Sequence, residues 1–366
     1  MKINRHRIEI LKIMKKQSYI AIAAARSGGH IIPGITLAHA HIKNNPETKV
    51  LFFSTNHVFD QKIMAEHQHS VHHIALTLDS VPQKWYQYPL FLVQFIGSLV
   101  TSMYHLARYR PSCVILMGGY VSIPVCIAAL IFRIPRELYE LNAVPGQATK
   151  LLAPIATKIH VCFEEARASF KAHKTHLSEY PLRFEKPSHS KNAVLNNLQL
   201  DSTRTTILIL GGSQGSMSLN KVIYRCFQEE PALQSAFNVI HQTGAQDSTH
   251  WGHVYHSLGV PAIVFDYHYD LSFYYQATDI VIARAGAGTI FETLFFSKSC
   301  ILIPLELKGN DHQLHNARAI AKEHPTMFTV ILTQELSENT EVLRRILTSH
   351  QTIQAISIGH SHEATL

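Results

Sequence analysis

The sequence predicts an α/β protein built from two Rossmann-like domains with parallel sheets, and its length and one repeated pattern carry this prediction. The chain has 366 residues, more than a single hydrophobic core usually holds. A unit made of an apolar run, a glycine turn and a helical pattern occurs four times, twice in each half. Strands that alternate with helices form parallel sheets, so we expect one such sheet in each domain.

The four units have the same form along the chain. Each has an apolar run followed by a glycine turn: 19–23 and 27–30, 113–117 and 118–119, 205–210 and 211–216, 279–283 and 284–289. In open α/β sheets, ligands bind at the carboxyl ends of the strands, where these turns lie. We therefore expect the two domains to face each other across a central cleft.

A polar stretch rich in Asn and Ser lies between the halves at residues 184–204, and we interpret it as the linker. The expected domains are residues 1–183 and 184–339, with a C-terminal helix at about 340–366 that packs back on the first domain. Residues 113–132 carry no charge and are nearly long enough to cross a bilayer. Glycines and a proline interrupt them, so we predict a buried strand, turn and helix there, and no transmembrane helix.

Composition narrows the function. The net charge of +7 suits phosphates, nucleic acid or an anionic membrane, and charge alone does not choose among them. The five cysteines form no CxxC pair, which indicates buried free thiols in a reducing compartment. Residues 1–18 are basic but lack the apolar core of a signal peptide, so we interpret them as an extension.

The glycine turns match neither a P-loop nor a clean GxGxxG, which argues against P-loop kinases and nicotinamide enzymes. A glycine turn at a helix N-terminus nevertheless binds phosphate through free N–H groups, and four such turns indicate a nucleotide-type ligand.

His30 follows two glycines at a predicted helix start, where a side chain points toward a bound ligand. An imidazole there is suited to accept a proton from an attacking hydroxyl, and Glu140 beside Asn142 is the next candidate base. The alternative is a histidine that only orients backbone. Glu292 suits the hydroxyls of a ribose, or is a solvated helix carboxylate. Gln313 and Asn316 suit a sugar, or belong to a helix start capped by Asp311.

Seven stretches occur in an order that resembles one family: "SGGHIIPG", "GGYVSIP", "ELNAVPG", "GGSQGS", "HQTG", "ATDIVIARAGAGTIFE" and "DHQLHNA", between residues 27 and 317. The chain resembles the MurG family, peptidoglycan glycosyltransferases with the GT-B fold. It departs from that family's pattern at Arg26, Tyr139 and Leu141. The resemblance implies inverting transfer of N-acetylglucosamine (GlcNAc) from UDP-GlcNAc to the 4-hydroxyl of N-acetylmuramic acid in lipid I, which gives lipid II.

The resemblance also implies the site residues. His30 and Asn142 are the expected catalytic residues. The expected UDP-GlcNAc-binding residues are Ser27, Gly28, Gly29, Asn142, Arg183, Ser213, His268 (through its backbone), Ala287, Gly288, Thr289, Ile290, Phe291, Glu292, Gln313 and Asn316. The chain holds no Asp-x-Asp metal clamp, so we expect neither a metal nor another cofactor.

Residues 84–110 mix aromatic and aliphatic side chains with flanking basic ones, contain Gln94, and are interpreted as too short to span a membrane. Such a segment lies in a membrane interface or is an ordinary amphipathic core helix. A lipid-linked acceptor favours the first, on the cytoplasmic face of the inner membrane. Wall-synthesis and division proteins are further expected partners, and nucleic acid is not. Rival functions are a UDP-sugar transferase with another lipid or a small acceptor, and a non-catalytic UDP-sugar-binding scaffold of a wall-synthesis complex.

Overall fold

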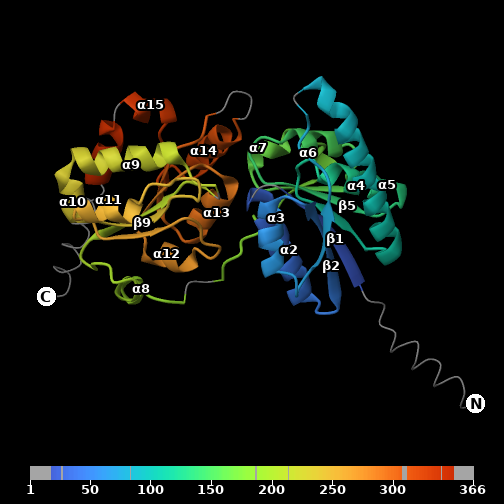
Figure 1. Cartoon of the computed structure of the whole chain (residues 1–366), viewed down its shortest axis with the longest axis horizontal. Helices are drawn as coiled ribbons and strands as arrows, with labels where there is room; N and C mark the ends of the chain where they lie inside the picture. Colours follow the sequence, from blue (N-terminus) through green and yellow to red (C-terminus); the bar gives the residue numbers. More distant parts are fainter. Residues whose placement is uncertain are drawn as a thin grey trace, which may run out of the picture. The chain divides into compact units, whose positions relative to one another are not determined.

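The structure of the chain is a computed structural model that describes residues 18–25, 28–82, 84–185, 188–212, 214–306, 311–338 and 340–349. The chain forms two compact units that divide between Arg183 and Phe184, each with its own parallel sheet (Figure 1). Figure 1 draws the described part of the first unit in blue to green and that of the second in yellow-green to red. The predicted α/β class with parallel sheets is confirmed.

The strands of the first unit are β1 Ser18–Ala23, β2 Thr48–Thr55, β3 His72–Leu76, β4 Val114–Leu116, β5 Arg136–Glu140, β6 Lys158–Val161 and β7 Thr175–Leu177. They form one parallel sheet in the order β3-β2-β1-β4-β5-β6-β7. The helices are α2 Gly28–Asn44, α3 Val58–Glu66, η1 Trp85–Gln87, α4 Tyr88–Tyr109, α5 Ser122–Ile131, α6 Gln147–Leu152, α7 Glu164–Arg167 and η2 Ala172–Lys174.

The strands of the second unit are β8 Thr205–Leu210, β9 Phe237–Gln242, β10 Ala262–Phe265, β11 Ile280–Ala283, β12 Ser299–Leu302 and β13 Phe328–Val330. They form a parallel sheet in the order β10-β9-β8-β11-β12-β13. The helices are α8 Lys191–Asn197, α9 Met217–Glu229, α10 Pro231–Ala236, α11 Trp251–Ser257, α12 Ser272–Ala277, α13 Ala287–Phe295, α14 His312–Glu323 and α15 Thr333–Glu338, and residues 341–349 are also helical.

The strand order reverses once in each sheet, and the predicted glycine turns lie at both reversals. β1 pairs with β4 in the first unit, and β8 pairs with β11 in the second. The four glycine turns follow these four strands. Such a switch point is where open α/β sheets bind ligands, because the chains leaving the two strands diverge there. The fold thus brings the two turns of each unit side by side.

The central strands are buried on both faces, as parallel strands covered by helices usually are. Ala21, Ile22 and Ala23 in β1, and Ile207, Leu208 and Ile209 in β8, are inaccessible to solvent. The predicted free thiols are also confirmed: all five cysteines are unpaired, and all except half-buried Cys113 are buried. Burial raises the pKa of the Cys162 thiol to about 12, so this side chain stays neutral and unreactive.

Residues 113–132 form β4, a glycine turn and α5, which confirms the predicted strand, turn and helix. The linker prediction for 184–204 is wrong for most of its length. Residues 191–197 form α8, whose first residue Lys191 pairs with Asp279 at 2.6 Å, and the backbone N–H of His189 donates to Gln276. The polar composition of this stretch suggested a linker, because composition alone does not show that these polar groups have partners within the second unit.

We expected a C-terminal helix at about 340–366 to pack back on the first unit. The described part of this segment packs on the second unit instead. Leu343 and Leu347 belong to the hydrophobic core of the second unit. The Thr340 hydroxyl donates to Glu229 at 2.5 Å. Apolar side chains on this short helix therefore bind it to the nearest core. Residues 350–366 of the expected helix lie outside the described residues.

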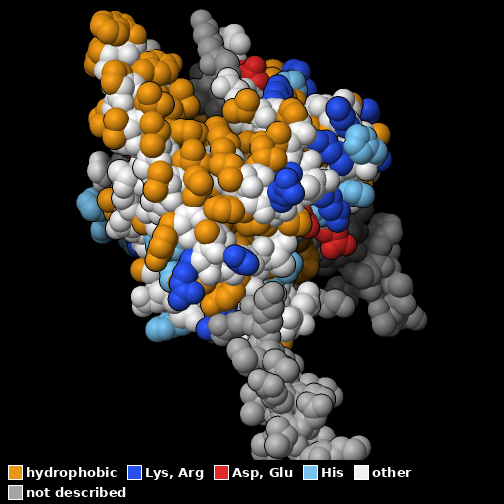
Figure 2. Space-filling model, turned by 90° about the vertical axis from the view of Figure 1, so that its right-hand side faces the viewer, with side chains coloured by type: hydrophobic (Ala, Val, Ile, Leu, Met, Phe, Trp, Pro, Cys, Tyr) orange, Lys and Arg blue, Asp and Glu red, His pale blue; other side chains and the backbone are white. Residues whose placement is uncertain are grey.

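Helix α4 presents most of its large apolar side chains to solvent, whereas the side that faces the protein combines two serines with a few apolar side chains. Its buried residues are Ser98, Ser102 and Leu106. Its exposed large side chains, with those of η1, are Trp85, Tyr86, Tyr88, Leu90, Leu92, Val93, Ile96, Val100 and Tyr104. Figure 2 shows hydrophobic side chains gathered on one face of the molecule, with Lys and Arg side chains at its edges. An ordinary core helix buries its apolar side chains, so this alternative is wrong.

The prediction that 84–110 is too short to span a membrane is also wrong. Trp85–Tyr109 form 25 residues of continuous helix, and this segment is the one within the described ranges that is long and apolar enough to cross a membrane. A helix of that length measures about 37 Å at 1.5 Å per residue, more than a hydrocarbon core. One face is nevertheless held by the first unit, since Ser98 donates to the Thr77 carbonyl and Leu106 is in the core.

Candidate active site

In the first unit, the imidazole of His30 lies against the second glycine turn. His30 is half-buried in the first turn of α2. A Cβ atom at Gly118 would lie 3.5 Å from Nε2 of His30, and one at Gly119 would lie 3.8 Å from Nδ1. Both glycines have positive φ, +88° and +73°, which favours glycine on its own. Because neither glycine carries a side chain, the two predicted turns of this unit meet at His30.

Asn142 lies on a loop that Glu140 holds together. Oε1 of Glu140 accepts from the Asn142 backbone N–H at 2.9 Å and from its side-chain Nδ2 at 3.1 Å. Oε2 accepts from the backbone N–H of Gly146 at 3.1 Å. Glu140 is only 3% exposed, so its carboxylate serves as the acceptor for the loop. Both oxygens of Glu140 therefore hold the loop that carries Asn142.

In the second unit, the turn after β8 packs backbone against backbone on the loop after β9. A Cβ atom at Gly215 would lie 2.3 Å from the Thr243 carbonyl oxygen and 2.5 Å from Cα of Gly244. The side chain of Gln242 donates to the Gly212 carbonyl at 2.8 Å. The "GGSQGS" and "HQTG" stretches are therefore one assembly, in which any side chain at Gly215 would separate the two loops.

A buried polar network centred on His241 supports this assembly. Nε2 of fully buried His241 lies 3.0 Å from Asn220 Oδ1, and Nδ1 lies 2.9 Å from the Tyr255 hydroxyl. The Asn220 amide donates to the Thr243 carbonyl and to Asp247. Burial lowers the pKa of His241 to about 3, so the ring is neutral. The sequence analysis identified the "HQTG" stretch but not this network. A histidine inside a buried strand was the feature that could have indicated it.

Arg284 joins three loops around the same turn. Its guanidinium donates to the hydroxyls of Ser216 and Ser218, at 2.9 and 2.7 Å from Nη2. Nη1 donates to the Ile303 carbonyl and the Thr333 hydroxyl, both at 3.0 Å. The side chain is 3% exposed and fixes the start of α9 beside the glycine turn. Sequence reasoning missed Arg284, although a lone cation between a buried strand and a glycine turn was a usable signal.

Helix α13 begins at the second glycine turn of this unit, with Gly286 at its N-cap. Ala287 and Ile290 are buried, and Gly288, Thr289 and Phe291 are half-buried. Glu292 is 8% exposed, and the Tyr275 hydroxyl donates to its Oε2 at 3.5 Å. The alternative of a solvated helix carboxylate is therefore wrong for Glu292. Ile290 is inaccessible to solvent, so a ligand contact from it needs its backbone.

The remaining predicted donor residues differ in their exposure. Asn316 is inaccessible to solvent and its amide donates to the Ala285 carbonyl at 3.3 Å, so it braces the turn before α13. Gln313 is half-buried, and its Oε1 accepts from the Leu305 backbone N–H at 2.9 Å. His268 is exposed and its Nδ1 lies 2.6 Å from the Asp270 carbonyl oxygen. Asp311 is the N-cap residue of α14, but its side chain makes no capping hydrogen bond to another described residue.

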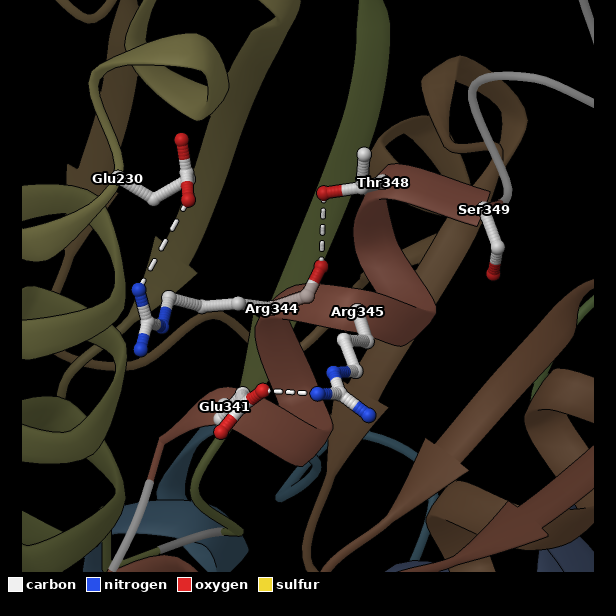
Figure 3. A pocket seen from close by; sticks show the side chains of 6 residues that line it. All are labelled: Glu230, Glu341, Arg344, Arg345, Thr348 and Ser349. Carbon is white, nitrogen blue, oxygen red and sulfur yellow. Dashed lines mark hydrogen bonds and ion pairs between the residues drawn. The ribbon is translucent and has the colours of Figure 1, made fainter.

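A separate pocket of about 480 Å³ lies on the second unit, away from the glycine turns (Figure 3). It is lined by Glu230, Glu341, Arg344, Arg345, Thr348 and Ser349. Arg344 pairs with Glu230 at 3.7 Å, and Arg345 pairs with Glu341. This pocket adjoins the C-terminal end of α9, whereas the candidate site lies at its N-terminal end, so the pocket is not part of the site. Within the described ranges, no group of three or more His, Cys, Asp or Glu side chains is placed to hold a metal ion.

Comparison with known proteins gives consistent matches in both units. Residues 20–161 match the N-terminal domain model of glycosyltransferase family 28, and residues 206–360 match the C-terminal domain model. The UDP-N-acetylglucosamine–N-acetylmuramyl-(pentapeptide) pyrophosphoryl-undecaprenol N-acetylglucosamine transferase of Thermodesulfovibrio yellowstonii is 32% identical over 326 residues, 89% of this chain and 88% of that protein. The chain belongs to the MurG family. The transferase of the same name from Caldicellulosiruptor saccharolyticus is 32% identical over 83% of this chain and 82% of its own.

The solved structure of Acinetobacter baumannii MurG has the same fold, with a TM-score of 0.68, 21% identity and 91% of each chain covered. The expected GT-B class is confirmed for this MurG-family chain, and its membership makes it a glycosyltransferase.

Two departures from the MurG pattern, Tyr139 and Leu141, are accommodated by packing. Tyr139 stacks on His160 with ring centroids 4.3 Å apart and planes 10° apart, and His160 in turn contacts Glu137 at 3.0 Å. Leu141 is 2% exposed. These two side chains therefore pack within the first unit, on either side of Glu140. Arg26, Ser27 and Ser213 lie outside the described residues.

Proposed function

We propose that this chain transfers GlcNAc from UDP-GlcNAc to the 4-hydroxyl of the N-acetylmuramyl group of lipid I, and so makes lipid II for peptidoglycan. The observation that carries the proposal is the 32% identity, over 89% of the chain, with a relative whose name states this transfer. The glycine turns at both switch points support it, because they supply backbone N–H groups where a nucleotide diphosphate binds.

The second unit is the proposed donor site. The diphosphate of UDP-GlcNAc lies against the turn after β8, with Ser213, and against the N-terminal turn of α13, with Ala287, Gly288 and Thr289. The Glu292 carboxylate accepts hydrogen bonds from the ribose hydroxyls, and Tyr275 holds it in place. Backbone groups of His268, Ile290 and Phe291 contact the nucleoside. Gln313 contacts the sugar directly, whereas buried Asn316 acts by holding the Ala285 turn.

The first unit is the proposed acceptor and catalytic site, with Ser27, Gly28 and Gly29 at the turn before His30. The 4-hydroxyl of the acceptor attacks C1 of GlcNAc on the face opposite UDP. As the new C1–O bond forms, the bond from C1 to the diphosphate oxygen breaks, and UDP leaves with that electron pair. His30 takes the hydroxyl proton. Asn142 orients the reacting sugar from the loop that Glu140 holds, and Arg183 offsets the charge that develops on UDP.

Turnover of UDP-GlcNAc with a lipid I analogue tests this proposal. Release of UDP together with a disaccharide product of inverted configuration is the expected result, in buffer containing EDTA, because we propose that no divalent ion takes part. A chain that transfers sugar only to another lipid or a small acceptor would be the rival transferase. A chain that binds UDP-GlcNAc with no turnover on any acceptor would be the non-catalytic scaffold.

The exposed apolar face of α4 is the proposed membrane contact. It holds Trp85, Leu92, Val93 and Val100, each more than half exposed, together with the aromatic side chains around them. Burying such an area in water-excluded surroundings is favourable at about 25 cal/mol per Å². Lys84 and Arg108 lie near its two ends, where they meet anionic headgroups. Because Ser98, Ser102 and Leu106 are bound to the first unit, α4 lies in the plane of the interface and does not cross the bilayer.

We propose that this contact holds the enzyme as a peripheral protein on the cytoplasmic face of the inner membrane, where its lipid-linked acceptor lies. Wall-synthesis and division proteins are the protein partners that we propose for it there.

A further inference from the structure

The chain enters the second unit at Phe184, whose ring packs against two aromatic side chains of that unit. The two units divide between Arg183 and Phe184, so Phe184 is the first residue of the second unit. Its ring centroid lies 5.3 Å from that of Phe296 and 6.2 Å from that of Tyr275, with the ring planes inclined by 58° and 62°. Inclined aromatic pairs are favourable, because ring edges and faces carry opposite partial charge. These contacts fix Phe184 on the second unit.

The two rings that receive Phe184 also hold the proposed ribose acceptor, Glu292. The rings of Tyr275 and Phe296 are parallel within 4°, with centroids 4.9 Å apart, and both side chains are buried. The Tyr275 hydroxyl donates to Oε2 of Glu292 at 3.5 Å, and the Phe296 backbone N–H donates to the Glu292 carbonyl at 3.1 Å. The aromatic cluster of Phe184, Tyr275 and Phe296 is therefore in direct contact with Glu292.

The chain that follows Phe184 is tied to the same part of the second unit. The His189 backbone N–H donates to Gln276 Oε1 on α12 at 3.0 Å. Lys191 pairs with Asp279 at 2.6 Å, and Asp279 also accepts from a backbone N–H of β8. A shift of this chain relative to α12 would break these polar bonds and the ring contacts together.

We propose that Phe184 is a positioning residue for Arg183, and that the aromatic cluster sets where the Arg183 guanidinium stands when the donor is bound. This inference rests on the proposed function, in which Arg183 offsets the charge that develops on UDP. Neighbouring Cα atoms are about 3.8 Å apart, so an anchored Phe184 restricts where the Arg183 backbone can lie. The acceptor for the ribose and the cation for the diphosphate then depend on one packed cluster of side chains.

Steady-state kinetics with UDP-GlcNAc and a lipid I analogue test this inference. Phe184→Ala removes the ring that anchors the chain and leaves the bond from Tyr275 to Glu292. We expect kcat to fall at least about 30-fold, because a displacement of about 1 Å at a reacting group can cost about 10²-fold in rate. The KM for UDP-GlcNAc should change less than about threefold, since negative charge on UDP grows only as its bond to C1 breaks. Phe184→Leu keeps a large apolar side chain and should recover most of the rate.

Phe295→Ala is the matched control. It removes a half-buried ring that lies 5.1 Å from Phe296 but is not joined to Arg183. We expect it to lower the urea midpoint of the second unit as Phe184→Ala does, and to keep kcat near that of the parent. In an Arg183→Gln background, Phe184→Ala should cost little more, because the group that it positions is gone. An equal loss of kcat in both backgrounds, or the same loss in Phe295→Ala, would overturn the inference.

Trypsin cleavage of the Arg183–Phe184 bond tests the same coupling without an acceptor. The new N-terminus at Phe184 is followed with and without UDP, at UDP concentrations that titration shows to saturate each variant. We expect UDP to slow this cleavage at least about tenfold in the parent and much less in Phe184→Ala. A parent that binds UDP with no change in cleavage would refute the coupling. If the parent shows this protection but no turnover with the lipid I analogue, the proposed transfer fails and the positioning of Arg183 by Phe184 stands.

Discussion

At the scale of single residues, His30 has two features that together suit a base. It stands in the first turn of α2, and its ring covers two glycines that leave it room. We expect His30→Ala to lower kcat by roughly 10²–10⁴-fold, because the attacking hydroxyl loses its proton acceptor. UDP affinity, measured by isothermal titration, should change little, since backbone groups hold the phosphates in the proposed site. His30→Gln, which keeps a side chain on the glycines, should be as slow. A variant with near-normal kcat would assign the base elsewhere.

Glu292 is the second residue whose role can be isolated. Its carboxylate is buried and braced by Tyr275, so its removal affects a pre-positioned acceptor. We expect Glu292→Gln to weaken UDP binding by about 1.5–3 kcal/mol, the value of hydrogen bonds to a charged group. Tyr275→Phe is the matched control: it leaves the carboxylate and removes only the brace, so it should cost much less. Equal affinities of Glu292→Gln and the parent for UDP would refute the ribose assignment.

At the scale of elements, the contact between the β8 turn and the β9 loop depends on Gly215. A Cβ atom there would overlap Thr243 and Gly244, and φ of +75° adds strain. We expect Gly215→Ala to abolish measurable UDP binding and to lower the urea midpoint of the second unit. Gly252→Ala is the control, because a Cβ atom there meets no described atom within 4 Å, and alanine favours helix α11. If both variants bind UDP equally, the two loops do not form one site.

Helix α4 exposes an apolar face to water. A large exposed apolar patch lowers solubility and marks a surface that binds a partner or a membrane. Val93 and Val100 are 67% and 59% exposed, so polar replacements remove little packing. We expect V93N/V100N to leave the urea midpoint unchanged and to lower vesicle binding several-fold. V58N/V342N alters two exposed valines outside α4 and should bind as the parent does. Vesicle binding that survives V93N/V100N at about 1 M salt would show that another surface holds the membrane.

At the scale of the whole molecule, the strands and turns that depend on a local sequence pattern could be predicted from the sequence. Apolar runs followed by glycine turns predicted β1, β4, β8 and β11, because both signals lie within a few residues of each other. Other site contacts that sequence reasoning missed join distant positions. The Gly215–Gly244 contact and the Arg284 bonds to Ser216 and Thr333 need the tertiary fold.

The inverted helix α4 shows a different limit. Its composition is that of a core helix, and it is the burial of Ser98, Ser102 and Leu106 that shows which face meets the protein. Likewise, α8 has a polar sequence whose partners, such as Asp279, lie far along the chain. Composition reports how much apolar surface a segment has, but not which side of it the rest of the chain covers.

The stability of the two units should also depend differently on pH, because the second unit buries His241 in its neutral form. An unfolded histidine titrates near pH 6.5, whereas burial holds the pKa of His241 at about 3 in the folded unit. Between these values the unfolded chain binds a proton that the folded unit does not. The free energy of unfolding of the second unit therefore keeps its full value above about pH 6.5 and falls as the pH drops toward 3. The loss that His241 causes is about 2 kcal/mol at pH 5. Asp247, whose pKa is lowered to about 2 by hydrogen bonds that outweigh its burial, loses its stabilising effect only as the pH falls below about 4, so it does not affect a comparison of pH 5 with pH 7.

Trp251 makes this prediction measurable in the second unit alone. The chain has two tryptophans, and Trp85 is exposed on η1, so Trp85→Phe leaves Trp251 as the reporter, 5.9 Å from the His241 ring. Urea unfolding followed by Trp251 fluorescence should give a lower midpoint at pH 5 than at pH 7. In the same background, His256→Gln changes an exposed histidine and should keep this difference, whereas His241→Gln should reduce it, because its side chain binds no proton in either state. Burial also lowers the pKa of His39 and His73 in the first unit, which Trp251 does not report. A Trp251 midpoint that is the same at both pH values would mean that His241 accepts a proton while folded, and that the network beneath the glycine turn opens to admit it.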